Sequence, residues 1–231
     1  MRIREMIVAA GLCSMAAGLL TEGEAFAQNV PPTPQRDKNW DLVSNLTMVL
    51  GASVVTLTPR IYYNDPEATV GWKGRWHVSV LAPAMTMTAL TLLVDIPIRG
   101  AVASTRPGCG VDQTLFPLTN CASFGGPSTQ AYASWGATGA GTGIFLVDTL
   151  KYSDRNFSVP SFLLNVILPL SLSVVTSVGR GVEPGTALAF ESPGQIVAGA
   201  LTGFASGLIV GGAYAFLQRP ACPYGNSIVC W

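Results

Sequence analysis

Three arginines and a serine are the residues of this chain whose types and spacing suggest chemistry. Arg99 and Arg106 stand seven positions apart in the stretch RGAVASTRP, Ser128 follows in GGPST, and Arg180 comes later in VGRG. Guanidinium groups beside a hydroxyl and glycine-rich backbone are typical of a site for phosphate or another anion. The four residues therefore predict an anion pocket, provided that the fold brings them together.

The same arginines also have a structural interpretation. Arg99 and Arg106 could anchor the ends of helices at a membrane interface, or pair with the acidic residues Asp95 and Glu191. In that case the guanidinium groups would serve stability and bind no ligand. The sequence favours neither interpretation over the other.

The composition indicates a membrane protein. Of the 231 residues, 49% are hydrophobic and 11% are charged, against roughly a quarter charged in an ordinary soluble domain. The 13 basic and 13 acidic residues cancel, and no cluster of Lys or Arg indicates a nucleic-acid surface. A nucleic-acid partner is therefore not expected.

Both ends of the chain are predicted to lie outside the helical bundle. Residues 1–27 resemble a secretory signal, with Arg2 and Arg4 before an apolar run and AFA before Gln28. An uncleaved first transmembrane helix is the alternative. Residues 28–39 are proline-rich and polar, which predicts an extended leader, and residues 218–231 are a C-terminal tail.

Five long apolar segments lie between these ends, and each has about the 20 residues that a helix needs to cross a bilayer. They are residues 41–59, 77–98, 130–150, 160–178 and 195–217. The last two are uncharged and are the surest spans. The third is glycine-rich and the second ends in Asp95, which predicts that these two pack inside the bundle. The expected fold class is an all-α membrane protein, a polytopic transmembrane bundle of about five spans over residues 40–217 after the signal segment.

The basic residues orient this bundle through the positive-inside rule. They follow the first, third and fifth segments, at Arg60, Lys73, Arg75, Lys151, Arg155 and Arg219. These loops are predicted to be cytoplasmic, so the loops 99–129 and 179–194 face the periplasm with the arginine pocket. The expected location is the bacterial inner membrane.

Four cysteines follow the signal segment in two close pairs. In an oxidising compartment the neighbours would bridge as Cys109–Cys121 and Cys222–Cys230. The orientation above places the second pair in the cytoplasm, where a disulfide is not expected, so the side of the tail stays open. Cysteines twelve positions apart with no histidine nearby do not suggest zinc, and neither a metal nor a cofactor is expected.

Glycine recurs at every fourth position of the last apolar segment, at Gly199, Gly203, Gly207 and Gly211. Such a face lets another helix approach closely. Packing within the chain's own bundle is the favoured use. A membrane protein partner or a second copy of this chain is the alternative.

Together the polar blocks resemble the signature blocks of the type-2 phosphatidic acid phosphatase and vanadium haloperoxidase superfamily, over about residues 77–217. That family's first block is a lysine, six residues and Arg-Pro; here Arg99 takes the place of the lysine and Arg106-Pro107 match. Its second block is Pro-Ser-Gly-His. Here Pro127-Ser128 match, Thr129 replaces the glycine and Gln130 replaces the histidine.

The third block departs most from the family pattern of Ser-Arg, a histidine and, four residues later, an aspartate. Gly179-Arg180 take the first two places, Glu191 that of the histidine and Gln195 that of the aspartate. The segment from Arg180 to Glu191 is several residues longer than in the family. Ala198-Gly199 then open the apolar helix, as the resemblance requires.

The resemblance implies a helical bundle in which Arg99, Arg106, Ser128 and Arg180 hold a phosphate. In the family one histidine attacks phosphorus, an aspartate orients it, and a second histidine protonates the leaving oxygen. The only histidine of this chain, His77, lies 22 positions from Arg99, hence ~33 Å away along a helix, and cannot take part.

The positions that would carry catalysis are degenerate. Gln130 and Gln195 are neither nucleophiles nor useful acids, and an ionised Glu191 repels the phosphate that arginines attract. The interpretation is therefore a pseudoenzyme, acting as a structural subunit of a membrane complex or as a binder of membrane lipids with anionic head groups.

Two other functions stay open. One is an active lipid-phosphate phosphatase, acting on phosphatidate or a prenyl pyrophosphate with altered residues. The other is a small channel or transporter subunit, for which Asp95 and Asp148 would be the intramembrane candidates. Both aspartates lie near the ends of their apolar segments, where interfacial solvation explains them more simply.

Overall fold

The computed structural model describes residues 38–58, 78–107, 109, 124–152, 155, 157–182 and 189–217. The chain divides into the compact units Met1–Thr33 and Pro34–Trp231, and all described residues belong to the second. The signal segment, His77, Cys121 and the C-terminal tail lie outside the described residues. Every regular element in the described ranges is a helix, and the one β-type pairing there is an isolated bridge between Ser104 and Gly126, which confirms the all-α expectation.

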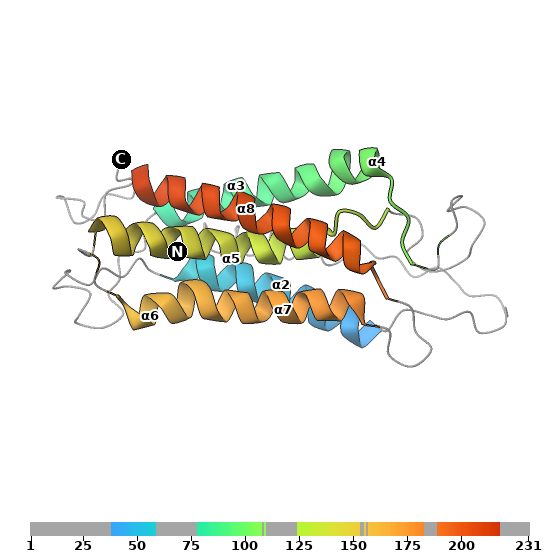
Figure 1. The fold of residues 1–231 in the computed structure, drawn as a ribbon, viewed down its shortest axis with the longest axis horizontal. Coiled ribbons are helices and arrows are strands. Elements are labelled where there is room, and N and C mark those ends of the chain that lie inside the picture. Colours follow the sequence, from blue (N-terminus) through green and yellow to red (C-terminus); the bar gives the residue numbers. More distant parts are fainter. Residues whose placement is uncertain are drawn as a thin grey trace, which may run out of the picture. The chain divides into compact units, whose positions relative to one another are not determined.

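Each of the five apolar segments forms a helix or a run of joined helices (Figure 1). They are α2 (Lys38–Leu57); α3 (Val78–Leu93), η2 (Val94–Ile98) and α4 (Arg99–Val102); α5 (Thr129–Val147) and η3 (Asp148–Tyr152); α6 (Val159–Phe162), η4 (Leu163–Ile167) and α7 (Leu168–Gly181); and α8 (Pro193–Leu217). Successive segments run in opposite directions, as expected for helices joined by loops. The first begins within the predicted leader, because Lys38 and Asn39 are already helical.

Four segments are long and apolar enough to cross a membrane: Lys38–Leu57, Ala82–Val102, Val159–Gly181 and Pro193–Leu217. Large apolar side chains point outward from them, including Leu42, Met85 and Ile209, at 67%, 72% and 70% exposure. This arrangement is consistent with a membrane-embedded protein, because such a surface is stable against lipid and costly against water.

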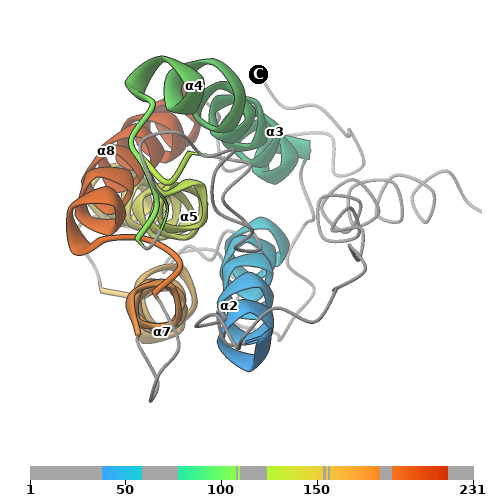
Figure 2. The same ribbon diagram turned by 90° about the vertical axis from the view of Figure 1, so that its right-hand side faces the viewer.

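The third apolar segment, which forms α5, is the centre of the bundle. Twelve of its 19 residues are buried, and it contacts α2, α3, α7 and α8. The view along the bundle shows these helices placed around it (Figure 2). Glycine, alanine and threonine make up most of the helix, and their low hydropathy keeps it out of the set of candidate spans. The prediction that this segment packs inside the bundle is confirmed.

The matching prediction for the second segment is wrong. Only 11% of its apolar window, Ala82–Val102, is buried, so this segment lies on the outside of the bundle. Asp95 does not require an interior position, because its carboxylate pairs with Arg99 one turn later, at 2.6 Å. An ion pair near the end of a helix satisfies the charge without burial among helices.

Glycines on one face of α8 let it lie directly against α5. A Cβ added at Gly203 would stand 2.8 Å from Tyr132 Cα, one at Gly207 2.8 Å from Ala140 N, and one at Gly211 2.6 Å from Ala140 Cα. Contacts this short exist only without side chains. The glycine face is therefore filled by the chain's own α5, as the favoured interpretation expected, and is not available to a partner.

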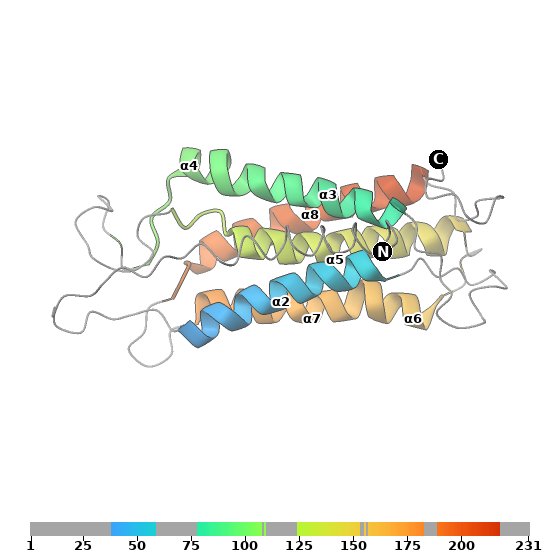
Figure 3. The same cartoon turned by 180° about the vertical axis from the view of Figure 1, so that it is seen from behind.

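Hydroxyl groups join the helices on the other side of α5. Thr47 of α2 bonds Thr176 of α7 at 2.8 Å, and Thr138 of α5 bonds Ser173 of α7 at 2.8 Å. Figure 3 shows α2 beside α7, the pair that the first of these bonds connects. Hydrogen bonds between helices in an apolar surrounding contribute roughly 0.6 kcal/mol each, and they fix the register of α2, α5 and α7.

Candidate functional site

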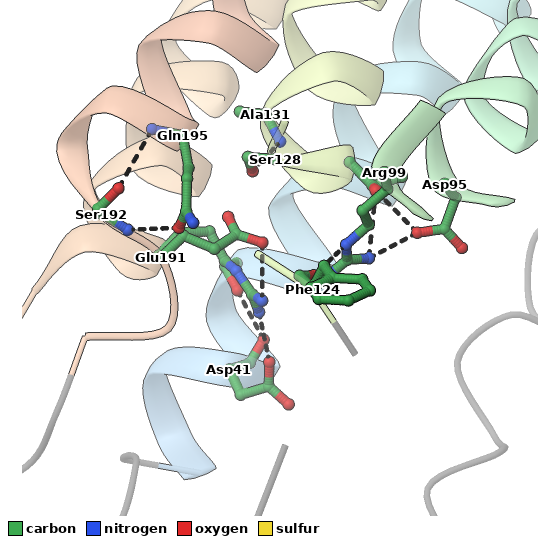
Figure 4. Close-up of polar contacts among 12 residues, drawn as sticks. Asp41, Asp95, Arg99, Phe124, Ser128, Ala131, Glu191, Ser192 and Gln195 are labelled. Carbon is green, nitrogen blue, oxygen red and sulfur yellow. Dashed lines mark hydrogen bonds and ion pairs between the residues drawn. The ribbon is translucent and has the colours of Figure 1, made fainter. Parts of the chain in front are cut away.

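The three polar blocks meet at one end of the bundle. This end collects the start of α2, the end of α4 with the segment after it, the start of α5, the end of α7 and the start of α8 (Figure 1). Figure 4 labels side chains from the start of α2, from η2 and α4, and from the starts of α5 and α8. Arg180, at the end of α7, pairs with two of them. The predicted convergence of the blocks is therefore present in the structure. We call this set of side chains the polar cluster: Asp41, Asp95, Arg99, Arg106, Ser128, Arg180, Glu191 and Gln195.

Arg99 is held by groups on both sides of the loop between α4 and α5. Its Nη1 donates to Asp95 Oδ1 at 2.6 Å and to Thr129 Oγ1 at 3.4 Å, and its Nε donates to the Phe124 carbonyl. Thr129 Oγ1 also donates to Asp95 Oδ1, at 2.8 Å. The structural interpretation of Arg99, a pair with Asp95, is thus present. Its Nη2 is buried and bonds no group in the described part of the chain.

Arg106 reaches the cluster because the chain reverses after α4. Ala103 adopts a left-handed conformation, with φ 48°, and ends the helix. The next residue, Ser104, then pairs with the strand-like segment before α5, accepting from Gly125 N at 2.8 Å. A Cβ on Gly125 would stand 2.8 Å from Arg106 Cγ and 2.7 Å from Gln195 Nε2. Gly125 therefore allows the buried Arg106 and Gln195 to close on the backbone from both sides.

Ser128 is the N-cap of α5. Its Oγ accepts from Ala131 N at 3.1 Å, and its own N donates to the Gln195 carbonyl at 3.0 Å. The side chain is fully buried. A serine at this position satisfies one of the helix's free N–H groups, so Ser128 has a structural task besides its predicted contact with phosphate. Among the described residues, its hydroxyl proton is donated to no other group.

Arg180 forms the centre of a second group of ion pairs. Its Nη1 donates to Asp41 Oδ1 at 2.7 Å and its Nη2 to Glu191 Oε1 at 3.4 Å. Its guanidinium also lies over the Phe190 ring, 4.5 Å from the centroid. Arg180 and Glu191 are 2% and 0% exposed. Arg180 Nε and Glu191 Oε2 remain without a partner among the described residues.

Asp41 is the member of the cluster that sequence reasoning missed. It stands in the first turn of α2, 139 positions before its partner Arg180. Its one detectable signal is that it is the acidic residue at the start of the first apolar segment, where the dipole of a helix also favours a carboxylate. That signal indicates a helix start and gives no information about Arg180.

In the family, the aspartate at the place of Gln195 orients the histidine at the place of Glu191. The Gln195 side chain makes other contacts. Its Oε1 accepts from Ser192 N at 2.8 Å, and its N bonds Ser192 Oγ at 3.4 Å. This reciprocal pair is the capping box of α8, Ser-x-x-Gln. The Nε2 group donates to Ser104 Oγ and to the Thr105 carbonyl, both at 2.8 Å. Gln195 therefore joins the first and third blocks and does not orient residue 191.

The charges within the cluster balance. Arg99, Arg106 and Arg180 supply three positive charges, and Asp41, Asp95 and Glu191 supply three negative charges. The third degenerate position, Gln130, lies half-buried on α5 with an Oε1 that has no partner in the described ranges. No group of three or more potential metal ligands occurs among the described residues.

The expected Cys109–Cys121 disulfide begins beside this cluster. Cys109 N donates to the Arg106 carbonyl at 3.0 Å, so this cysteine lies in a turn three positions after the buried arginine. Cys121, Cys222 and Cys230 lie outside the described residues, and both pairings stay predictions. Asp148, a candidate of the channel hypothesis, is buried at the far end of α5, away from the polar cluster.

Comparison with known proteins identifies no relative: no family model, no curated protein and no solved structure matches this chain.

Proposed function

We propose that this chain is a catalytically inactive membrane protein with the architecture of the lipid-phosphate phosphatase superfamily, and that it binds a phosphate-bearing lipid head group at the polar cluster. The observation that carries the proposal is a pair of buried donors. Arg99 Nη2 and Arg180 Nε lack partners within the described residues, although both guanidinium groups are at least nine-tenths buried. A buried donor without a partner costs about 1–3 kcal/mol, which a phosphate oxygen would recover.

Several features support a binding role without turnover. Gln130 stands where the family has one histidine, and an amide cannot protonate a leaving group at useful rates. Glu191 stands where the family has the nucleophile, and its carboxylate is engaged by Arg180 at 3.4 Å. Gln195, in place of the orienting aspartate, is bonded to Ser192, Ser104 and Thr105 and contributes nothing to activating residue 191.

A structural subunit of a membrane complex is the second candidate, and the ion pairs favour it. Arg180 connects the start of α2, through Asp41, with the segment before α8, through Glu191. Arg99 connects η2 with the start of α5. Both arginines therefore hold helices together. If the protein is a structural subunit, they need no ligand. Purification in mild detergent and identification of co-purifying proteins tests it.

The proposal also includes the identity of the membrane and the side of it on which the polar cluster lies. Basic residues follow the first, third and fifth segments in the sequence, and the helices of these segments end on the side of the bundle away from the polar cluster (Figure 1). The positive-inside rule then puts the polar cluster on the periplasmic side of a bacterial inner membrane. Head groups of the outer leaflet would reach it without crossing the bilayer.

Lipid binding by the purified chain tests the proposal. Native mass spectrometry in detergent, with phosphatidate and phosphatidylethanolamine added in turn, should show one lipid retained. Arg99→Lys keeps a charge near Asp95 but removes Nη2, and should weaken retention about tenfold, the usual loss of one charge-assisted hydrogen bond. Lys151→Gln is the matched control, because Lys151 caps the carbonyl of Phe216 at the opposite end of the bundle. Equal retention by both variants would refute a head-group site at the polar cluster.

A further inference from the structure

The polar cluster contains a buried hydrogen-bond acceptor without a partner, as well as buried donors without partners. Glu191 Oε2 is buried and has no partner among the described residues, just as Arg180 Nε and Arg99 Nη2 have none. Glu191 is fully buried, so bulk water does not reach its second oxygen. An anion alone would satisfy the donors and leave this carboxylate oxygen as it is. The set of unpartnered atoms therefore calls for a ligand that both accepts and donates.

The charge balance gives the same indication. Asp95 and Glu191 already neutralise part of the arginine charge, at 2.6 Å from Arg99 and 3.4 Å from Arg180. A phosphate without a counter-charge would add negative charge next to two carboxylates in a buried place, which is costly. A ligand that carries one positive and one negative group adds no net charge to the cluster.

A continuous set of contacts links the two halves of the cluster. Arg99 bonds the Phe124 carbonyl, and the adjacent Gly125 lies against the Gln195 amide. Gln195 in turn accepts from Ser192, the neighbour of Glu191, and Glu191 pairs with Arg180. Figure 4 shows Arg99, Ser128, Glu191 and Gln195 in one close-up at this end. The two halves of the cluster are therefore joined through Gln195 and the backbone at Gly125.

Building on the proposed function, we infer that the polar cluster selects a zwitterionic ethanolamine phosphate group over an anionic or choline-bearing one. The phosphate oxygens accept from Arg99 Nη2 and Arg180 Nε. The primary ammonium donates to Glu191 Oε2. A choline group carries the same charge but has no N–H to donate, and phosphatidate and phosphatidylglycerol have no cation to offer. Glu191 is then a specificity-determining residue and not a nucleophile.

Methylation of the amine separates this inference from simple charge attraction. The unmodified full chain in detergent is titrated with phosphatidylethanolamine, its mono- and dimethyl forms, and phosphatidylcholine, with binding followed by native mass spectrometry. We expect affinity to fall by about tenfold when the last N–H is replaced, the loss of one hydrogen bond between charged groups. Equal affinity for the ethanolamine and choline lipids would overturn the inference. Soluble phosphoethanolamine, added as a competitor, tells whether the head group suffices without its lipid chains.

Two variants test whether the ammonium of the ligand contacts Glu191. Glu191→Gln keeps the shape of the side chain and removes its charge, so the preference for ethanolamine over choline should disappear. Lys151→Gln, at the opposite end of the bundle, leaves the polar cluster unaltered and should keep the preference. A preference that survives Glu191→Gln contradicts the inference, and so does a site that binds phosphatidate more tightly than phosphatidylethanolamine.

The lipid titration distinguishes a failure of the inference from a failure of the proposed function. If phosphate lipids bind with no preference for the primary amine, the proposed function stands and the inference is wrong. If no phosphate lipid is retained, water alone occupies the unpartnered groups, and both are wrong. The methylation series uses the unaltered chain, so it gives a result even if Glu191→Gln fails to fold.

Discussion

Replacing Gly211 by alanine should disrupt the contact between α5 and α8. The added Cβ would stand 2.6 Å from Ala140 Cα, whereas ordinary contact begins at about 3.4 Å. The helices must therefore separate by at least the difference, about 0.8 Å, along a face that also includes Gly199, Gly203 and Gly207. Overpacking of this kind costs about 1–3 kcal/mol. We expect the free energy of unfolding to fall by that amount.

The adjacent Gly212 provides a matched control. A Cβ there would meet its nearest neighbour, Gly143 Cα, at 4.0 Å, an ordinary contact. Both glycines lie inside the same helix, so both substitutions bring the same intrinsic gain in helix propensity, and the difference between the variants isolates the packing. Unfolding in mixed micelles with increasing dodecyl sulfate, followed by circular dichroism, gives the two free energies. Equal stability of Gly211→Ala and Gly212→Ala would refute the packing of α8 on α5 through this face.

Three further predictions concern the cluster and its setting. Arg180→Ala leaves the fully buried Glu191 without its partner, and should lower the free energy of unfolding by about 3–5 kcal/mol. The double variant Arg180→Ala, Glu191→Ala should lose less stability than the sum of the two single variants. A strictly additive loss would show that the pair does not interact. Cys109 and Cys121 should resist alkylation until reductant is added, because bridging a loop of this length stabilises the fold by about 3 kcal/mol; two free thiols in protein isolated without reductant would rule the bridge out. A reporter that folds only in the cytoplasm should fluoresce when fused after Phe157 and stay dark when fused after Pro107, and the opposite pattern would reverse the proposed orientation.

The helices could be predicted from the sequence because each apolar run is bounded by polar turns. The central place of α5 could be predicted as well, since a helix rich in glycine offers little to lipid and much to neighbouring helices. The prediction for the second segment is wrong because a lone Asp95 suggests a charge that needs an interior position. Its partner, Arg99, stands four positions later, and the pair satisfies the charge at the edge of the bundle.

The site could be predicted in position but only partly in its contacts. The convergence of the three blocks follows from the alternating direction of the helices. The ion pair between Asp41 and Arg180 joins residues 139 positions apart, and no local pattern indicates it. Gln195 was assigned to a catalytic place, although Ser192-Pro193-Gly194-Gln195 is also a capping box; the structure shows that the cap is the contact that forms.

The release of phosphate from a bound lipid tests the central claim most directly. Purified protein in nanodiscs that contain phosphatidate should release no more inorganic phosphate than protein-free nanodiscs, as followed by ³¹P NMR. No histidine can act at the polar cluster, and the arginines alone supply only a small part of an enzyme's acceleration. Phosphate release that persists in the pure protein and disappears in Glu191→Gln would contradict the account and establish a carboxylate nucleophile.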